Sequence, residues 1–241
     1  PGMLMACMRL DVPAIIVSGG PMMTGCYKGK KMGYVDLMSS QGLVAKNIIT
    51  EEKLSEMELD ALPGCGACNL LGTANSMDYL TEALGMCLPG SAAPAASARR
   101  IALAKKTGQK IMELLEKGIT PSRIITMKAL ENAITVDLAI GGSTNTILHL
   151  TALAYEAEID FDVRLFADMS KKVPHLVKLS PAENGHYPED LYYAGGITAL
   201  MAELNEAGLI HGEALTVTGK TVSENVDGAE VIDPSVIRPV D

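Results

Sequence analysis

The stretch VPAIIVSGGP, residues 12–21, decides the predicted fold, because it is an unbroken apolar run that ends in two glycines and a proline. A buried strand of a parallel sheet has this composition, and the glycines and proline indicate a tight turn after it. Further along the chain, short β-branched runs alternate with amphipathic helical stretches, as in α/β domains. We therefore predict an α/β fold with an open, mostly parallel sheet flanked by helices.

Capping residues indicate where the clearest helices begin and end. Ser97 predicts the start of a helix that Gly118 ends, and Thr126 predicts the start of the next, which ends at Gly141. The spacing of the first helix places six small or apolar residues on one face: Ile101, Ala104, Gly108, Ile111, Met112 and Leu115. We expect this face to pack against the domain.

Two other segments complete the expected organisation. Residues 215–221, LTVTGKT, alternate like an exposed or edge strand. Residues 22–62 mix glycine, lysine and polar residues around a modest helical segment over residues 50–59. We expect residues 22–62 to form a mobile surface segment. No boundary is indicated within residues 1–241, so we predict a single α/β domain.

Composition restricts the classes of function. Hydrophobic residues make up 48% of the 241 residues and charged residues 20%, which excludes a disordered or fibrous chain. The net charge is −9 without a basic stripe, which argues against nucleic-acid or anionic-membrane partners. No apolar run approaches the roughly 20 residues of a membrane span. Five unevenly spaced cysteines and no recognisable signal peptide predict a reducing, cytoplasmic location.

The ends of the sequence suggest part of a longer protein. The first residue is Pro1, and PGMLMACMRL has the composition of the middle of a helix. The last residues, VIRPVD, have the composition of a linker. We expect the chain to be an incomplete fragment of a larger enzyme domain.

The sharpest chemical motif is PGCGAC, residues 63–68, in which two residues separate Cys65 and Cys68. We expect a helix to begin at about Cys68, where free amides and the helix dipole would stabilise a thiolate. A zinc site would usually need a second cysteine pair, and a thioredoxin-like dithiol would need a preceding strand. An iron–sulfur cluster with further ligands elsewhere is compatible with the spacing, as are two buried cysteines at a glycine turn.

Two glycine-containing turns are further candidates for a binding site. In GGSTNT, residues 141–146, Ser143, Thr144 and Asn145 would place hydroxyls and free amides at a helix start. Such a start can bind a carboxylate or a phosphate, although an ordinary capped helix has the same pattern. The turn SGGPM, residues 18–22, would lie at the carboxyl end of the predicted strand and could form a wall of a site. It lacks the glycine spacing of a dinucleotide site.

Taken together, these motifs resemble the dihydroxy-acid and sugar-acid dehydratase family, and most closely its dihydroxy-acid members. The matching stretches occur in family order across nearly the whole chain: PGMLMA (1–6), VSGGPM (17–22), PGCGAC (63–68), TANSM (73–77), LTEALGM (80–86), LPG (88–90), GGSTNT with LHL (141–150) and LTVTGKT (215–221).

The resemblance implies dehydration of a 2,3-dihydroxy carboxylic acid to a 2-keto acid, in valine and isoleucine biosynthesis. It implies a 2Fe–2S or 4Fe–4S cluster whose open iron acts as a Lewis acid, and a Mg²⁺ ion that binds the substrate. The second cysteine of the matching motif is the family's cluster ligand, which assigns Cys68 as a metal ligand and Cys65 as its neighbour. A homodimer or homotetramer is typical of the family.

The resemblance also indicates what this chain lacks. In the family, a Cys-Asp-Lys segment just before PGMLMA supplies a second cluster cysteine and Mg²⁺ ligands, and a C-terminal barrel-like domain supplies the proposed serine base. We therefore expect the 241 residues alone to be inactive. The string GTANS, residues 72–76, is similar to phosphogluconate dehydratase, so a sugar acid is the alternative substrate. A non-catalytic α/β module with a redox cysteine pair is the alternative outside the enzyme class.

Overall fold

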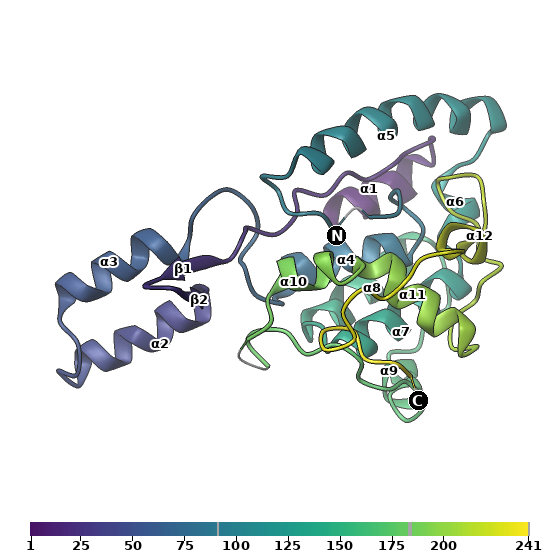
Figure 1. The fold of residues 1–241 in the computed structure, drawn as a ribbon. Helices are drawn as coiled ribbons and strands as arrows, with labels where there is room; N and C mark the ends of the chain where they lie inside the picture. Colours follow the sequence, from purple (N-terminus) through teal and green to yellow (C-terminus); the bar gives the residue numbers. More distant parts are fainter. Residues whose placement is uncertain (91, 183–184, 241) are drawn as a thin grey trace.

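The computed structural model describes residues 1–90, 92–182 and 185–240. It shows a helical body from which a small lobe extends to one side (Figure 1). The body contains the following helices: α1 (Gly2–Leu10), α4 (Thr73–Ala83), α5 (Ala98–Lys117), α6 (Pro121–Ile124), α7 (Met127–Ile140), α8 (Asn145–Glu156), α9 (Arg164–Met169), α10 (Pro188–Tyr193), α11 (Gly196–Glu206) and α12 (Val222–Val226).

The cap residues predicted the two clearest helices correctly. The Ser97 side chain accepts a hydrogen bond from the Arg99 amide at the start of α5, and Gly118 ends the helix in a left-handed conformation. Thr126 likewise accepts from the Ala129 amide at the start of α7. Each capping residue acts on the backbone at the end of its own helix, so these helix ends can be predicted without knowing what the helices pack against.

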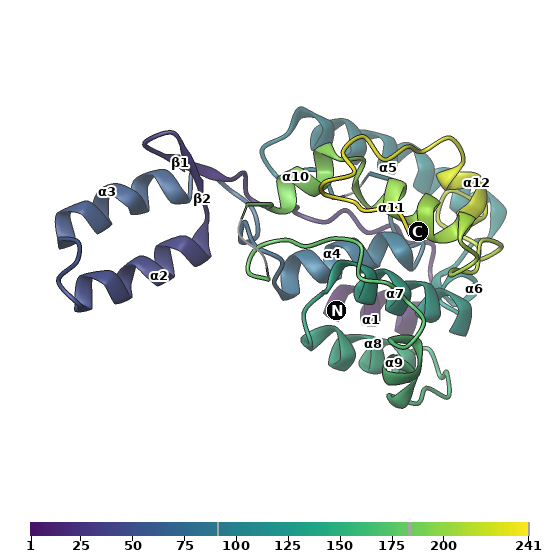
Figure 2. The same cartoon turned by 60° about the horizontal axis from the view of Figure 1, so that its bottom comes forward.

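Helices α4 and α7 lie against each other at the centre of the body (Figure 2). Tyr79 and Leu80 of α4 and Leu130 and Ile134 of α7 are fully buried. Helices α8 and α11 also pack on α4. The core of the domain is therefore made of helices, and the start of α4 is held at its edge.

The predicted open parallel sheet is not found among the described residues, where the fold is a mostly helical α/β domain with one small sheet. Strands β1 (Gly25–Tyr27) and β2 (Lys30–Met32) pair antiparallel in the lobe. The apolar run 12–21 is extended but forms no strand, and the Ile16 amide donates to the Met86 carbonyl. Helices α4 and α7 occupy the position that the central strands of the predicted sheet would have taken. Residues 12–21 therefore have no neighbouring strand to pair with.

The predicted edge strand at residues 215–221 is also wrong. This segment folds into a tight turn in which Leu215 and Thr221 form an isolated bridge. The Thr216 amide donates to the Lys220 carbonyl at 3.0 Å. Alternating polar and apolar residues are thus compatible with a compact loop that buries Thr216 and Val217.

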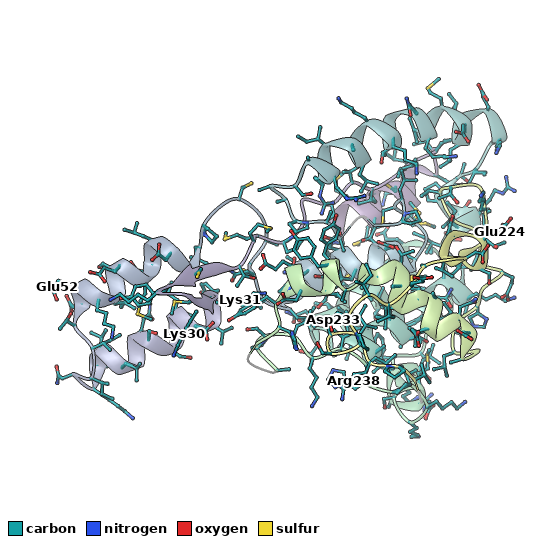
Figure 3. All side chains as sticks on the ribbon, viewed as in Figure 1. Lys30, Lys31, Glu52, Glu224, Asp233 and Arg238 are labelled. Atoms are coloured by element: carbon teal, nitrogen blue, oxygen red, sulfur yellow. The ribbon has the colours of Figure 1, made fainter. Side chains whose placement is uncertain are left out.

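The lobe contains β1, β2, α2 (Tyr34–Ala45) and α3 (Glu51–Ala61), which confirms the helix expected around residues 50–59. Hydrogen bonds tie its base to the body, one from the Thr24 amide to Glu189 and one from the Tyr187 hydroxyl to Asp36. Lys31, which is labelled in Figure 3, lies at this junction and forms an ion pair with Asp190. The mobility expected for residues 22–62 stays a prediction.

In the part of the chain that the structure describes, no helix combines the length and apolarity needed to cross a bilayer.

Candidate functional site

Both cysteines of the CxxC motif are exposed and free, in the loop between α3 and α4. This excludes two buried structural cysteines. The helix predicted to begin at about Cys68 begins instead at Thr73, after Gly72 as its N-cap. Cys68 therefore lies outside the first turn of α4, and the loop rather than the helix positions its thiol.

The cysteine loop pairs with the SGGPM turn. The Ala67 amide donates to the Gly20 carbonyl at 2.9 Å, and the Met22 amide donates back to the Ala67 carbonyl at 2.7 Å. Gly66 passes so close that an added Cβ would lie 2.5 Å from the Met22 nitrogen. The turn thus packs against the cysteine loop, although the strand expected before it is absent, and its role as a wall of a binding site stays a prediction.

Asn75 fixes the other side of the cysteine loop. Its side-chain nitrogen donates to the Cys68 carbonyl at 2.6 Å and to the Leu70 carbonyl at 2.7 Å. Asn75 is buried in the first turn of α4, so these bonds tie the loop to the helix in the core. The side-chain amide of the buried Asn75 therefore helps to hold the Cys68 backbone in position.

We expect Asn75→Asp to loosen this loop, because a carboxylate would face two carbonyl oxygens that had received hydrogen bonds. The free energy of unfolding should fall by about 3 kcal/mol. Urea unfolding of the full-length protein checks this result, with Asn47→Asp as the control. Asn47 is exposed in the lobe, and that variant adds the same charge. Equal stability of the two variants would contradict the assigned role.

The GGSTNT motif contacts the same end of α4 as the cysteine loop. The Ser143 and Thr73 hydroxyls lie 3.1 Å apart, and the Asn145 side-chain nitrogen donates to Thr73 at 2.8 Å. The Ser143 amide donates to the Ser76 hydroxyl at 2.9 Å. Thr144 is the N-cap of α8, which confirms a helix start here.

Three motifs that are far apart in the sequence therefore meet at the start of α4. The cysteine loop lies between the SGGPM turn and α4, and the GGSTNT loop contacts α4 through Thr73 and Ser76. Thr144 and Asn145 are exposed, and Ser143 is half-buried. This arrangement leaves a thiol and a group of hydroxyl and amide donors at one end of a buried helix.

Sequence reasoning missed two charged residues that support the SGGPM turn. Arg100 of α5 is buried and donates to the Ser18 carbonyl at 2.8 Å and to the Ala93 carbonyl. Its guanidinium lies 4.0 Å from the Asp78 carboxylate. Burial raises the pKa of Asp78 to about 7. The only signal in the sequence was an acidic residue within the apolar stretch after TANSM.

Two open pockets border the converging motifs. One, of about 280 Å³, lies between α1, the SGGPM turn and α4, and is lined by Ser18, Thr73 and Asp78. The other, of about 440 Å³, is lined by Ser143 and Thr144 together with Asp137 at the end of α7. Both pockets place polar side chains from the start of α4 or of α8 beside apolar walls.

The described residues do not by themselves form a complete metal centre. No three histidine, cysteine, aspartate or glutamate side chains within them gather closely enough to hold a metal ion. Cys65 and Cys68 are the two thiols of the loop, and the other cysteines lie on α1, on β1 and after α4. This set fits one point of attachment to a larger centre.

Comparisons with known proteins agree with the motif set. A family model described as dihydroxy-acid/6-phosphogluconate dehydratase N-terminal matches residues 1–225. A protein named dihydroxy-acid dehydratase from Ignicoccus hospitalis is 53% identical over 242 residues, and one from Carboxydothermus hydrogenoformans is 52% identical over 242 residues. Each comparison covers 100% of this chain and 44% of the relative.

The chain thus spans less than half the length of the curated relatives that it matches. The match extends across all the motifs that meet at the start of α4, so the resemblance drawn from the sequence is confirmed. The chain belongs to the dihydroxy-acid/6-phosphogluconate dehydratase N-terminal family.

Proposed function

We propose that the full-length protein containing this chain dehydrates a 2,3-dihydroxy carboxylic acid to a 2-keto acid, with Cys68 as one ligand of an iron–sulfur cluster. The observation that carries the proposal is the exposed Cys68 thiol in a loop held between the SGGPM turn and the start of α4. The relatives named dihydroxy-acid dehydratase, about half identical to this chain, support the same reaction.

The donor set fits a shared cluster rather than a site of this chain alone. Iron–sulfur clusters take thiolate ligands that can come from distant loops, and Cys68 is an accessible thiol with glycine at positions 64 and 66 around its neighbour. When bound, the cluster would supply a Lewis acid for the departing hydroxyl, and a Mg²⁺ ion would bind the substrate. The described residues hold no group of three such ligands, so most of the remaining ligands of both would come from elsewhere in the full-length protein.

The GGSTNT loop would bind the substrate's carboxylate. Thr144 and Asn145 are exposed at the start of α8, where their polar side chains and the positive end of the helix dipole favour an anion. Thr73 of α4 hydrogen-bonds both Ser143 and Asn145, so the loop is fixed relative to the cysteine loop. A substrate held there would have its orientation set by α4.

The reaction proposed removes the C2 proton and the C3 hydroxyl, which leave together as water, and the resulting enol becomes the 2-keto acid. Anaerobically purified full-length protein tests it, by comparing 2-keto acid formation from 2,3-dihydroxyisovalerate and from 6-phosphogluconate. We expect turnover of the dihydroxy acid to exceed that of the sugar acid. Greater turnover of 6-phosphogluconate would place the protein among the sugar-acid dehydratases. No turnover of either acid by iron-loaded protein would contradict the proposal.

A further inference from the structure

A buried cluster of polar groups lies behind the GGSTNT loop. Asp137, in the last turn of α7, is only 6% exposed, and Thr146, in the first turn of α8, is fully buried. The Thr146 hydroxyl lies 2.7 Å from the Asp137 carboxyl oxygen Oδ2 and 2.6 Å from the Ser143 carbonyl oxygen. The cluster thus joins the end of α7 to the backbone of the residue that opens the loop.

The number of protons available in this cluster bears on the state of Asp137. A threonine hydroxyl has one proton to donate, and the Ser143 carbonyl can only accept. If Asp137 were ionised, the Thr146 oxygen would face two acceptors at short distance with one proton between them. If Asp137 carries a proton on Oδ2, it donates to Thr146 and Thr146 donates to Ser143. Each short contact then has its own proton.

The second carboxyl oxygen points to the same state. Oδ1 of Asp137 is buried without a hydrogen-bond partner in the described part of the chain. It packs against Gly142 so closely that an added Cβ there would lie 2.0 Å from it. A buried, unpartnered oxygen is far less costly on a neutral acid than on a carboxylate. Burial correspondingly raises the pKa of Asp137 to about 6, against a smaller opposing effect of Thr146.

Among the described residues, burial and the Thr146 hydrogen bond are the two influences on the pKa of Asp137. The elements packed on α7 are α4, α8 and α9, and the His175 ring lies against Gly141. Their charged or titratable groups include Asp78 and Glu82 on α4, His149 on α8, and Arg164 and Asp168 on α9. The pKa of Asp137 responds to burial and to the Thr146 hydrogen bond and to none of these.

We propose that Asp137 is a positioning residue that holds the GGSTNT loop in its binding geometry as the neutral acid, and that loss of its proton loosens the loop and weakens binding of the substrate carboxylate. The binding part of this proposal rests on the proposed function. The protonation part rests on the buried cluster alone. Asp137 would act on the loop through Thr146 and Ser143.

The direction of the pH effect follows from the raised pKa. The folded state holds the proton up to about pH 6, whereas the unfolded chain releases it near 3.8. The stability contributed by the neutral acid is therefore complete below pH 3.8 and is lost as the pH rises through about 6. Relative to a variant without this proton, the unfolding constant should rise roughly tenfold per pH unit in this window and level off above it.

The test compares full-length wild type with Asp137→Asn, Asp137→Ala and Thr146→Val. In Asp137→Asn, an amide replaces the acid and can donate to Thr146 at any pH. We expect the unfolding constant of wild type, divided by that of Asp137→Asn, to rise between pH 4 and 6. Infrared difference spectra should show a protonated carboxyl band that titrates near pH 6 in wild type and is missing in Asp137→Asn.

Measurements of substrate binding test the binding part of the proposal separately from the protonation part. We expect KM for the dihydroxy acid to rise above about pH 6 in wild type and to stay at the low-pH value in Asp137→Asn. Asp137→Ala and Thr146→Val should raise KM at every pH, with less effect on kcat. If the carboxyl titrates at its ordinary value, the protonation assignment is overturned. If it titrates near 6 but KM is the same in all variants, the positioning role is overturned. If no dihydroxy acid is turned over, the titration still decides the protonation, and the failure belongs to the proposed function.

Discussion

Replacing Cys68 by serine in the full-length protein is expected to lower both bound iron–sulfur cluster and dehydratase activity by more than about 100-fold. Serine has nearly the shape of cysteine but is a poor ligand for cluster iron. Because the Cys68 side chain is exposed, the substitution removes no core contact and should leave the free energy of unfolding of the metal-free protein unchanged. Iron and sulfide content and the visible charge-transfer absorption measure the loss directly.

Cys65→Ser is the matched control, since Cys65 is an exposed thiol of the same loop. The structure distinguishes the two cysteines. The Cys68 carbonyl accepts a hydrogen bond from Asn75, and the preceding residue, Ala67, forms an isolated β-bridge. Residues 63–66, which include Cys65, are all exposed. We expect Cys65→Ser to retain most of its cluster. Normal iron content in Cys68→Ser would refute the ligand assignment. A wild-type protein that binds no iron but forms a reversible disulfide between Cys65 and Cys68 would favour the redox pair.

The local part of the fold could be predicted from the sequence. Ser97, Thr126 and the glycines that end α5 and α7 act on neighbouring backbone groups, so their effect does not depend on the rest of the domain. The run at residues 12–21 had no such local determinant. An apolar extended segment becomes a strand only if another strand lies beside it, and here helices fill that position.

The face of α5 shows a second limit of periodicity. The apolar residues Ile101, Met112 and Leu115 share a face, as predicted, but that face is exposed in this chain. The buried face carries Arg100 and Thr107 instead. A buried arginine is stable only when distant groups receive its hydrogen bonds, and the Ser18 carbonyl does so across 82 positions of sequence. Helical spacing contains no information on such a partner.

The candidate site was likewise predictable from the sequence only in its local features. Its chemical groups were recognisable in the sequence, since a cysteine pair among glycines and a run of hydroxyl residues after two glycines are local patterns. Their meeting at the start of α4 was not, because it depends on Thr73, Asn75 and Ser76, which lie within a helix that was expected to start earlier. The one indication of Asp137 in the sequence was an acidic residue four positions before the GGSTNT motif, in the apolar second half of its helix.

Gly66→Ala is expected to destroy the geometry of the cysteine loop, at a cost of roughly 3 kcal/mol in the free energy of unfolding. Gly66 has a φ of +135°, which side-chain-bearing residues rarely adopt, and an added Cβ would lie 2.5 Å from the Met22 nitrogen and 2.7 Å from the Pro21 carbonyl carbon. Both atoms belong to the backbone, so no side chain can rotate away. The two hydrogen bonds between this loop and the SGGPM turn should break, and Cys68 should lose its position.

Gly64→Ala is the control for this substitution. Gly64 lies two residues earlier in the same loop, and an added Cβ there would have no atom within 4 Å. It should therefore keep the stability and the cluster content of wild type. Urea unfolding and iron content of the two full-length variants make the comparison. If Gly66→Ala binds iron as well as Gly64→Ala does, the pairing of the cysteine loop with the SGGPM turn does not position the ligand. If Gly66→Ala loses iron and Gly64→Ala does not, the close backbone approach at Gly66 is what holds Cys68 in place.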